Sequence, residues 1–362
     1  MILDRQALIA AVQHNCDVAD ARHAGELSLC NYLLQMREFF RWQAGLPFEA
    51  TLSRVAVGEW IAAREAHWDA LQADDYRPIP GAAGAWLDPF DAGAVNAAVQ
   101  PFGLVYGAGR IGGGSGRPVF FVADAYGHHH RAGLDVVQAG REWARGLAAP
   151  PAALAGGGEG PILIRRESLA RWGWQGVEAH RLRPAGSSAW HAVVRAYGFD
   201  RGFDAALPGW LEDQVEIATL HELGEHDESR RRGGDWAGLR ERLASRRGWL
   251  HATALRDHLA DLNSTLPALL AREDTAPLHA WFSALDGVHA ALFPRLASAY
   301  RRWCAGEGRA VLAEAVARGR EHFEERARLC FAALHAGVDA AGLEQLLSGP
   351  GSACTDEPPA PC

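Results

Sequence analysis

Lysine is absent from this sequence of 362 residues, and all 36 basic side chains other than histidine are arginines. Arginine stays protonated in proteins, so it cannot replace lysine as a nucleophile. The absence therefore excludes Schiff-base chemistry, including enzymes that tether pyridoxal phosphate (PLP) to a lysine. It also excludes P-loop nucleotide binding, whose motif ends in Lys followed by Ser or Thr, and the ordinary protein kinases.

Long apolar runs and closely spaced cysteines are missing as well. No apolar stretch reaches the roughly 18 residues that suggest a membrane span, and residues 1–11 lack the apolar core of a secretory signal. None of the six cysteines forms a Cys-x-x-Cys pair, and Cys354 and Cys362 lie in a Pro-rich tail. We therefore expect a soluble, cytoplasmic protein with reduced thiols and no membrane partner.

Positive charge is in deficit, because 36 basic residues face 44 acidic ones and the formal net charge is −8. A protein that binds a nucleic-acid duplex normally presents a basic face. The basic clusters here are short, at 230–232 and 246–247. We therefore expect no nucleic-acid partner, while an unknown small molecule or protein partner and the oligomeric state stay open.

The pattern of apolar residues predicts a mainly α (α+β) protein with one small antiparallel β-meander in the middle of the chain. Helical spacing covers residues 5–75 and about 190–347. Ser53 is a predicted helix start. Three short β-type runs lie between these regions, at 102–106, 119–122 and 134–137.

Shorter signals complete the predicted organisation. We expect a small helix at 141–147, a flexible Pro/Ala/Gly connection at 150–160, and a strand at 161–164 that leads into a helix from Arg166. A single globular domain over 1–348 is then expected, followed by a disordered tail at 349–362. Its predicted parts are helical residues 1–99, a β-rich insert at about 101–165 and helical residues 166–348.

Two motifs in the β-rich region have an unremarkable structural interpretation. Gly107, Gly109 and Gly112 fit the dinucleotide-binding pattern Gly-x-Gly-x-x-Gly, but another strand follows where that mechanism needs a helix. A hairpin loop is the better interpretation. The three histidines at 128–130 point in different directions if they are consecutive in a turn, so we expect a solvent-exposed turn rather than one metal site.

The strongest functional signal is the helix predicted over residues 210–229. Its apolar residues cover most of its circumference, which is typical of a buried helix. One line of apolar residues along the helix nevertheless continues, on the same face, into Glu222, Glu225 and Ser229. His221 and Glu225 are four residues apart and share one face. Buried carboxylates and imidazoles are costly unless they are paired or bind a metal.

This segment differs from the zinc-peptidase motif His-Glu-x-x-His, because Glu225 stands at the second histidine position and His226 follows one residue late. One residue turns a helical side chain by about 100°, so the zinc-peptidase geometry is lost. A histidine and carboxylates on a helix instead suit iron, manganese or zinc. A second helix, with Asp261 beside its leucine stripe, is predicted to kink at Pro267.

Several stretches resemble an uncharacterised proteobacterial protein family that carries only a locus-tag label and has no known function. They are ADARHAGELSLCNYLLQMREFFRW, IRRESL, HELGE and RDHLADLNSTLP. The resemblance covers nearly the whole chain up to about residue 349, and it implies a full-length protein of one family. His226 falls outside the shared HELGE motif, and Gln43 stands where the family pattern implies an acidic residue.

Three functional hypotheses follow from these residues. In the first, a metal-dependent enzyme such as an oxidase or hydrolase binds a divalent metal (Fe, Mn or Zn) through His221 and Glu225, with Glu222 as a ligand or general base; Asp20 and His23 complete the site from the N-terminal helix. In the second, a non-catalytic binding or scaffold protein uses the same residues as a structural network with arginine partners. In the third, arginines bind a small anion, namely Arg165, Arg166 and Arg256.

Overall fold

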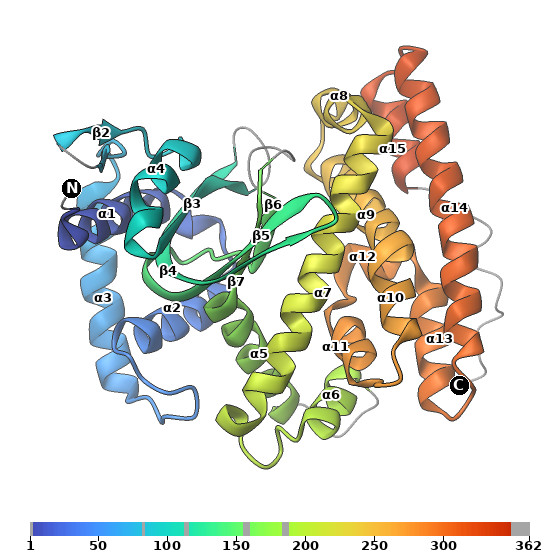
Figure 1. Ribbon diagram of the computed structural model, residues 1–362, viewed down its shortest axis with the longest axis horizontal. Helices are drawn as coiled ribbons and strands as arrows, with labels where there is room; N and C mark the ends of the chain where they lie inside the picture. The colour runs from blue at the N-terminus through green and yellow to red at the C-terminus, as the bar shows by residue number, and fades with distance from the viewer. Residues whose placement is uncertain (1–2, 82–83, 112–115, 155–159, 183–187, 349–362) are drawn as a thin grey trace. The chain divides into compact units, whose positions relative to one another are not determined.

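The computed structural model describes residues 3–81, 84–111, 116–154, 160–182 and 188–348. The chain divides into two compact units, Met1–Gln175 and Gly176–Cys362, which are described separately below (Figure 1). The expected single domain over 1–348 stays a prediction. The expected tail at 349–362, with Cys354 and Cys362, lies outside the described residues, as does Gly112.

The N-terminal unit begins with the helices predicted over residues 5–75. Each starts where a short polar side chain accepts hydrogen bonds from backbone N–H groups, as helix N-caps do: Asp4 caps α1, Ser28 caps α2 and Ser53 caps α3. Asp91 caps the later helix α4 in the same way. The bounds of these helices are α1 Arg5–His23, η1 Ala24–Glu26, α2 Leu29–Gln43, α3 Arg54–Leu71, α4 Ala92–Val99 and η3 Gln100–Phe102.

A five-stranded sheet in the order β3-β4-β5-β7-β6 follows these helices. The expected meander is present as β3, β4 and β5, but β7 pairs parallel with β5, and a separate pair β1–β2 precedes it. The mainly α class is therefore right, whereas one antiparallel meander understates the β structure. The strands are β1 Ile79–Pro80, β2 Trp86–Leu87, β3 Leu104–Ile111, β4 Arg117–Arg131, β5 Leu134–Arg145, β6 Ala152–Leu154 and β7 Ile162–Arg165.

Two local predictions in this region are wrong. The helix expected at 141–147 is the end of strand β5, where Glu142 is buried against Arg165. A strand is normally recognised by apolar residues at every second position, which point to the buried face of the sheet. Charged residues occupy some of these positions at the end of β5, so the sequence does not show the alternating pattern of a strand there. The connection expected at 150–160 contains strand β6 at Ala152–Leu154, which pairs with β7, while residues 155–159 lie outside the described residues.

The histidine run was also misplaced. Residues 128–130 belong to strand β4, and the turn comes later, at Ala132 and Gly133, whose φ angles are 50° and 88°. Two central residues with positive φ are the geometry of a tight two-residue hairpin. The glycines at 107 and 109 lie within β3, which pairs with β4 as a hairpin.

The core of the N-terminal unit lies between α1 and the sheet. Leu8, Val12 and Cys16 recur along one face of α1 and pack against Phe120 and Val122 of β4. All five side chains are almost fully buried. This face gives α1 its orientation against the sheet.

Helix α5 (Arg166–Arg181) starts at the predicted residue and spans the boundary between the units. The described part of the C-terminal unit is helical, as expected for residues 190–347. Its helices are α6 Ala189–Tyr197, α7 Phe203–Arg232, α8 Asp235–Arg242, α9 Arg246–Ala260, α10 Leu266–Ala271, α11 Ala276–Ala284, α12 Gly287–Leu292, α13 Pro294–Cys304, α14 Ala310–His335 and α15 Ala340–Ser348. No helix in the described ranges combines the length and the apolar character that crossing a membrane requires.

Pro267, where the helix was predicted to kink, lies near the start of α10. Helix α9 runs into a π-helical turn, η5 (Asp261–Thr265), and then into α10. Pro267 lacks a backbone N–H, so the regular bond to the residue four positions earlier cannot form. The residues just before Pro267 form the wider π helix in place of a regular α-helical turn. Such π turns are frequent at functional sites.

Candidate metal centre

Helices α7 and α9 approach each other closely at Gly224. A Cβ atom at this position would lie 2.7 Å from the backbone oxygen of Ala260 and 2.9 Å from its Cα atom. Any larger residue would therefore push the helices apart. The glycine of the HELGE segment thus lets the face of α7 that carries His221 and Glu225 lie directly against α9.

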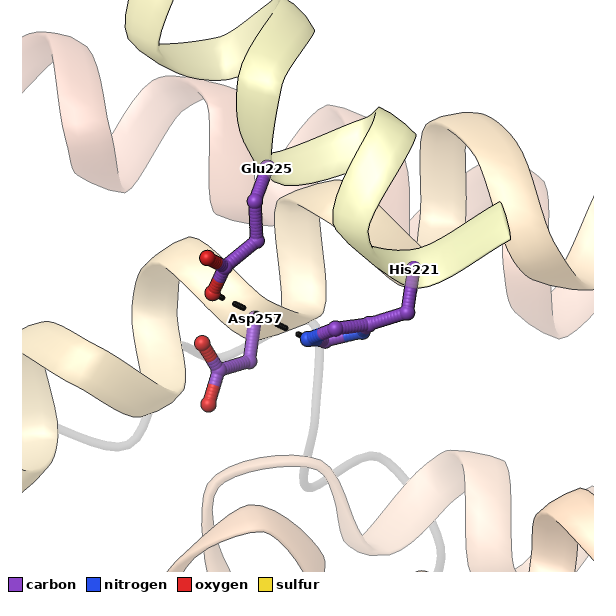
Figure 2. A group of neighbouring side chains, drawn as sticks. All are labelled: His221, Glu225 and Asp257. Atoms are coloured by element: carbon purple, nitrogen blue, oxygen red, sulfur yellow. Dashed lines mark ion pairs between the residues drawn. The ribbon is translucent and has the colours of Figure 1, made fainter. Parts of the chain in front are cut away.

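Three side chains converge where the helices meet. His221 and Glu225 come from α7 and Asp257 comes from α9, and Figure 2 shows the three pointing toward one another. One nitrogen or oxygen atom from each lies within 4.8 Å of the others, the only such group of three or more potential metal ligands among the described residues. The structure therefore brings two predicted ligands together and adds Asp257.

Asp261 fixes the orientation of the His221 ring. Its Oδ1 atom lies 2.9 Å from Nδ1 of His221, while Nε2 on the other side of the ring lies 3.7 Å from Oε1 of Glu225. Metal-binding histidines commonly donate their second ring N–H to a carboxylate in this way. Burial alone would lower the pKa of His221, but the charge and hydrogen bond of Asp261 raise this pKa well above its ordinary value.

Asp257 is also oriented by a hydrogen bond from a neighbouring histidine. Nε2 of His289 on α12 donates to Oδ2 of Asp257 at 2.9 Å. His289 is positioned in turn by His258, whose Nε2 donates to the His289 backbone oxygen at 3.0 Å. His258 stacks on Phe323 with 4.5 Å between ring centroids, so it supports the site from the core.

Arg256 is the one arginine that pairs with this group in the described part of the chain. Its Nη2 atom lies 2.7 and 2.6 Å from the two carboxylate oxygens of Glu225. Burial opposes the charged form of Glu225, but the His221 hydrogen bond and the Arg256 charge hold its pKa well below the usual range. Glu225 is therefore ionised, and Arg256 contacts both of its carboxylate oxygens.

Glu222 lies on α7 between the two predicted ligands. Its residue is only 7% exposed, and no described residue forms a hydrogen bond or ion pair with its carboxylate. Burial, followed by repulsion from Glu225, raises the pKa of Glu222 to about 7. It is the unpaired acid of the group.

The predicted ligands Asp20 and His23 belong to the N-terminal unit, where each has other partners. Asp20 forms an ion pair with Arg117 and accepts the backbone N–H of Leu147. His23 contacts Glu26 at 2.8 Å. Their role as metal ligands stays a prediction, as does the anion site, whose arginines pair here with Glu142, Gln138 and Glu225.

Sequence reasoning missed Asp257 and gave Asp261 too little weight. The signal was present, because Asp257 of α9 and Asp261 at the start of η5 repeat the four-residue spacing of His221 and Glu225 on α7. What the sequence alone could not give was the contact between the two helices. His226, in contrast, is not one of the three converging residues.

An open hollow of about 420 Å³ lies beside Gly224. It is lined by residues of α7 and of the π turn, and none of the three converging residues is among them. The lining residues are Gly224, Asp227, Arg230, Arg231, Asn263 and Ser264.

Two family models match the chain in succession. Residues 7–165 match the model described as "Family of unknown function (DUF6866) N-terminal domain", and residues 170–347 match the corresponding C-terminal domain. The curated proteins and the solved structures gave no match. The candidate metal centre lies wholly within the part that matches the C-terminal domain.

Proposed function

The chain belongs to the family of unknown function DUF6866, and we propose that it is a metal-dependent enzyme whose C-terminal domain binds one divalent iron, manganese or zinc ion. The proposed ligands are His221, Glu225 and Asp257. The observation that carries the proposal is their convergence within 4.8 Å from two helices. One imidazole and two carboxylates form a donor set that suits these metals.

The charge balance of the group supports a cation. Four carboxylates lie together or on neighbouring turns, whereas Arg256 supplies one permanent positive charge. The four are Glu222, Glu225, Asp257 and Asp261. Buried charges are strongly unfavourable without partners, so a divalent cation would offset the excess.

The supporting residues also resemble those of metal sites. Asp261 orients His221, and His289 orients Asp257. These hydrogen bonds leave Nε2 of His221 and Oδ1 of Asp257 to face the centre. Three protein ligands leave further coordination positions open, as catalytic sites do. A bound ion would supply a Lewis acid there.

Glu222 is the proposed general base. It is buried beside two ligands and has no described partner that would hold its carboxylate away from a reacting water. A general base needs a pKa near the working pH. Hydrolysis and oxidation are the reaction classes that this arrangement supports, with the substrate a small molecule.

One observation favours a second candidate, a non-catalytic binding or scaffold protein. Arg256 contacts both oxygens of Glu225, which is the arginine partner that a structural network requires. A protonated His221 between Asp261 and Glu225 would complete that network without a metal. The two candidates therefore differ in whether a cation or protons balance the carboxylates.

The location proposed for the protein is a reducing compartment, the cytoplasm. The cysteines in the described part of the chain, Cys16, Cys30, Cys304 and Cys330, are all free thiols. Disulfides are rare in such compartments.

Elemental analysis by plasma mass spectrometry tests the proposal. Protein purified without a tag and dialysed against dilute EDTA is compared with the His221→Ala/Glu225→Ala variant and with a His226→Ala control on the same helix. We expect about one metal ion per wild-type and His226→Ala chain, and loss of metal from the double variant.

The milder variant Glu225→Gln shows whether any loss reflects misfolding, because it keeps the side-chain volume and one acceptor oxygen. Circular dichroism should show both variants folded. Metal-free wild-type protein that also fails to take up added Mn²⁺ would overturn the metal proposal and favour the structural network.

A further inference from the structure

Two histidines and one aspartate lie near one another at the tip of the hairpin formed by β4 and β5, with their ligand atoms more widely spaced than those of the C-terminal centre. In this hairpin His130 is paired with Asp135, and His128 is paired with Val137. Alternate residues of a strand point to the same face of the sheet. His128 and His130 therefore share one face with Asp135, while His129 points to the other.

The distances confirm this grouping. Nε2 of His128 and Nδ1 of His130 each lie 3.2 Å from the same atom, Oδ1 of Asp135. The hydrogen bond from His130, with that of His128, lowers the pKa of Asp135. Two imidazoles already compete for one carboxylate oxygen here.

We propose that His128, His130 and Asp135 bind a first-row divalent cation of the zinc, copper or nickel type. Imidazole nitrogens suit these ions, and two imidazoles with one carboxylate are a common zinc donor set. The ligand atoms must move closer together to reach zinc–nitrogen distances of about 2.0–2.1 Å. The side chains are free to do so, because their exposed fractions are 64%, 65% and 54%.

The backbone favours such a site, because it holds the three residues in register. The tight turn at Ala132 and Gly133 joins the two strands directly beyond them, and Arg131 pairs with Leu134 across it. The site stands independently of the proposed function, since it uses other residues of another unit. Its donor set is richer in nitrogen than that of the C-terminal centre, so it favours zinc over manganese.

Equilibrium dialysis of the full chain with Zn²⁺ tests the site. The wild type is compared with His128→Ala/His130→Ala and with the matched control His129→Ala, which removes the neighbouring imidazole from the opposite face. Losing an outer-shell partner of a metal ligand typically costs 10–100-fold in affinity. Removing two direct ligands should therefore weaken binding at one site by about 100-fold or more, whereas His129→Ala should leave it unchanged.

All three positions are exposed, so these variants should fold, and urea unfolding should confirm equal stability. Equal losses in His129→Ala and in the double variant would mean that any surface histidine suffices, and would overturn the proposal. So would Zn²⁺ binding that the double variant retains in full. Asp135→Asn should weaken binding less than the double variant, because it removes one ligand of three.

Discussion

The buried carboxylates of the N-terminal unit and those of the candidate metal centre have different partners, although Glu228, elsewhere in the C-terminal unit, also pairs with arginines. Among the described residues of the N-terminal unit, each of the four most buried carboxylates is in an ion pair with an arginine: Asp17 with Arg64, Asp20 with Arg117, Glu38 with Arg41, and Glu142 with Arg165. In the C-terminal unit, four neighbouring carboxylates pair with Arg256 alone among the arginines.

This difference separates two uses of buried charge. Pairing each of these four acids with a guanidinium satisfies the charge within the fold. An excess of acids, ordered by supporting histidine and aspartate contacts, instead leaves room for a cation. The comparison therefore assigns a structural role to the N-terminal ion pairs and a ligand-binding role to the C-terminal group.

Removing an N-terminal arginine should have the largest effect on stability. Arg117→Ala leaves Asp20 buried without its partner, and breaking a buried pair in this way typically costs about 3–5 kcal/mol. Urea unfolding measures the loss. The exposed pair of Arg5 with Asp124 supplies the control, because Arg5→Ala should cost less than about 1 kcal/mol. Equal losses in the two variants would contradict a structural role for the buried pair.

Glu167 tests what happens to an N-terminal acid that lacks an arginine hydrogen bond. Burial, followed by repulsion from Glu142, raises its pKa to about 7. Between pH 4.5 and 7 the folded protein keeps this proton while the unfolded chain has lost it, so the free energy of unfolding falls as the pH rises. The loss due to Glu167 should reach about 2–3 kcal/mol.

Unfolding of the wild type and of Glu167→Gln at pH 4.5 and 7.5 isolates this contribution, because other titrating groups are common to both proteins. Glutamine keeps an oxygen that can accept the Glu142 backbone N–H. The variant should lose less stability across the interval. Parallel pH profiles would show that Glu167 does not titrate there.

Gly224→Ala should separate α7 from α9 and loosen the candidate centre. The added Cβ would lie 2.7 Å from the Ala260 backbone oxygen, and overpacking of this kind costs about 1–3 kcal/mol. Gly209, on the same helix, has no atom within 4 Å of an added Cβ. Gly209→Ala should therefore be neutral or stabilise α7 by up to about 1 kcal/mol. Thermal unfolding of both variants checks the contrast, and equal stability would contradict the tight contact.

The sequence predicted the fold best where side-chain patterns are local. Helix starts at Ser53 and Arg166 were correct, because capping and apolar spacing depend on neighbouring residues. The end of β5 was missed because Glu142 is satisfied by Arg165, which lies elsewhere in the chain. Parallel pairing of β5 with β7 likewise depends on contacts that no local pattern records.

In the candidate site, too, residues placed by local spacing were predicted and residues placed by distant contacts were missed. His221 and Glu225 were found because one helical face carries both, and that spacing is visible in the sequence. Asp257 was missed because its proximity depends on the helix contact at Gly224. The histidine hairpin was misjudged as a turn, since only the true turn at Ala132 and Gly133 reveals that His128 and His130 share a face.

Metal-linked stability tests most directly whether the C-terminal carboxylates are balanced by a cation. Urea unfolding is measured with and without Mn²⁺ at ten times its dissociation constant, in the His128→Ala/His130→Ala background so that the hairpin does not contribute. Mn²⁺ should then raise the free energy of unfolding by about 1.4 kcal/mol, and Glu225→Gln should abolish this gain. No stabilisation, or an equal gain in Glu225→Gln, would contradict the account.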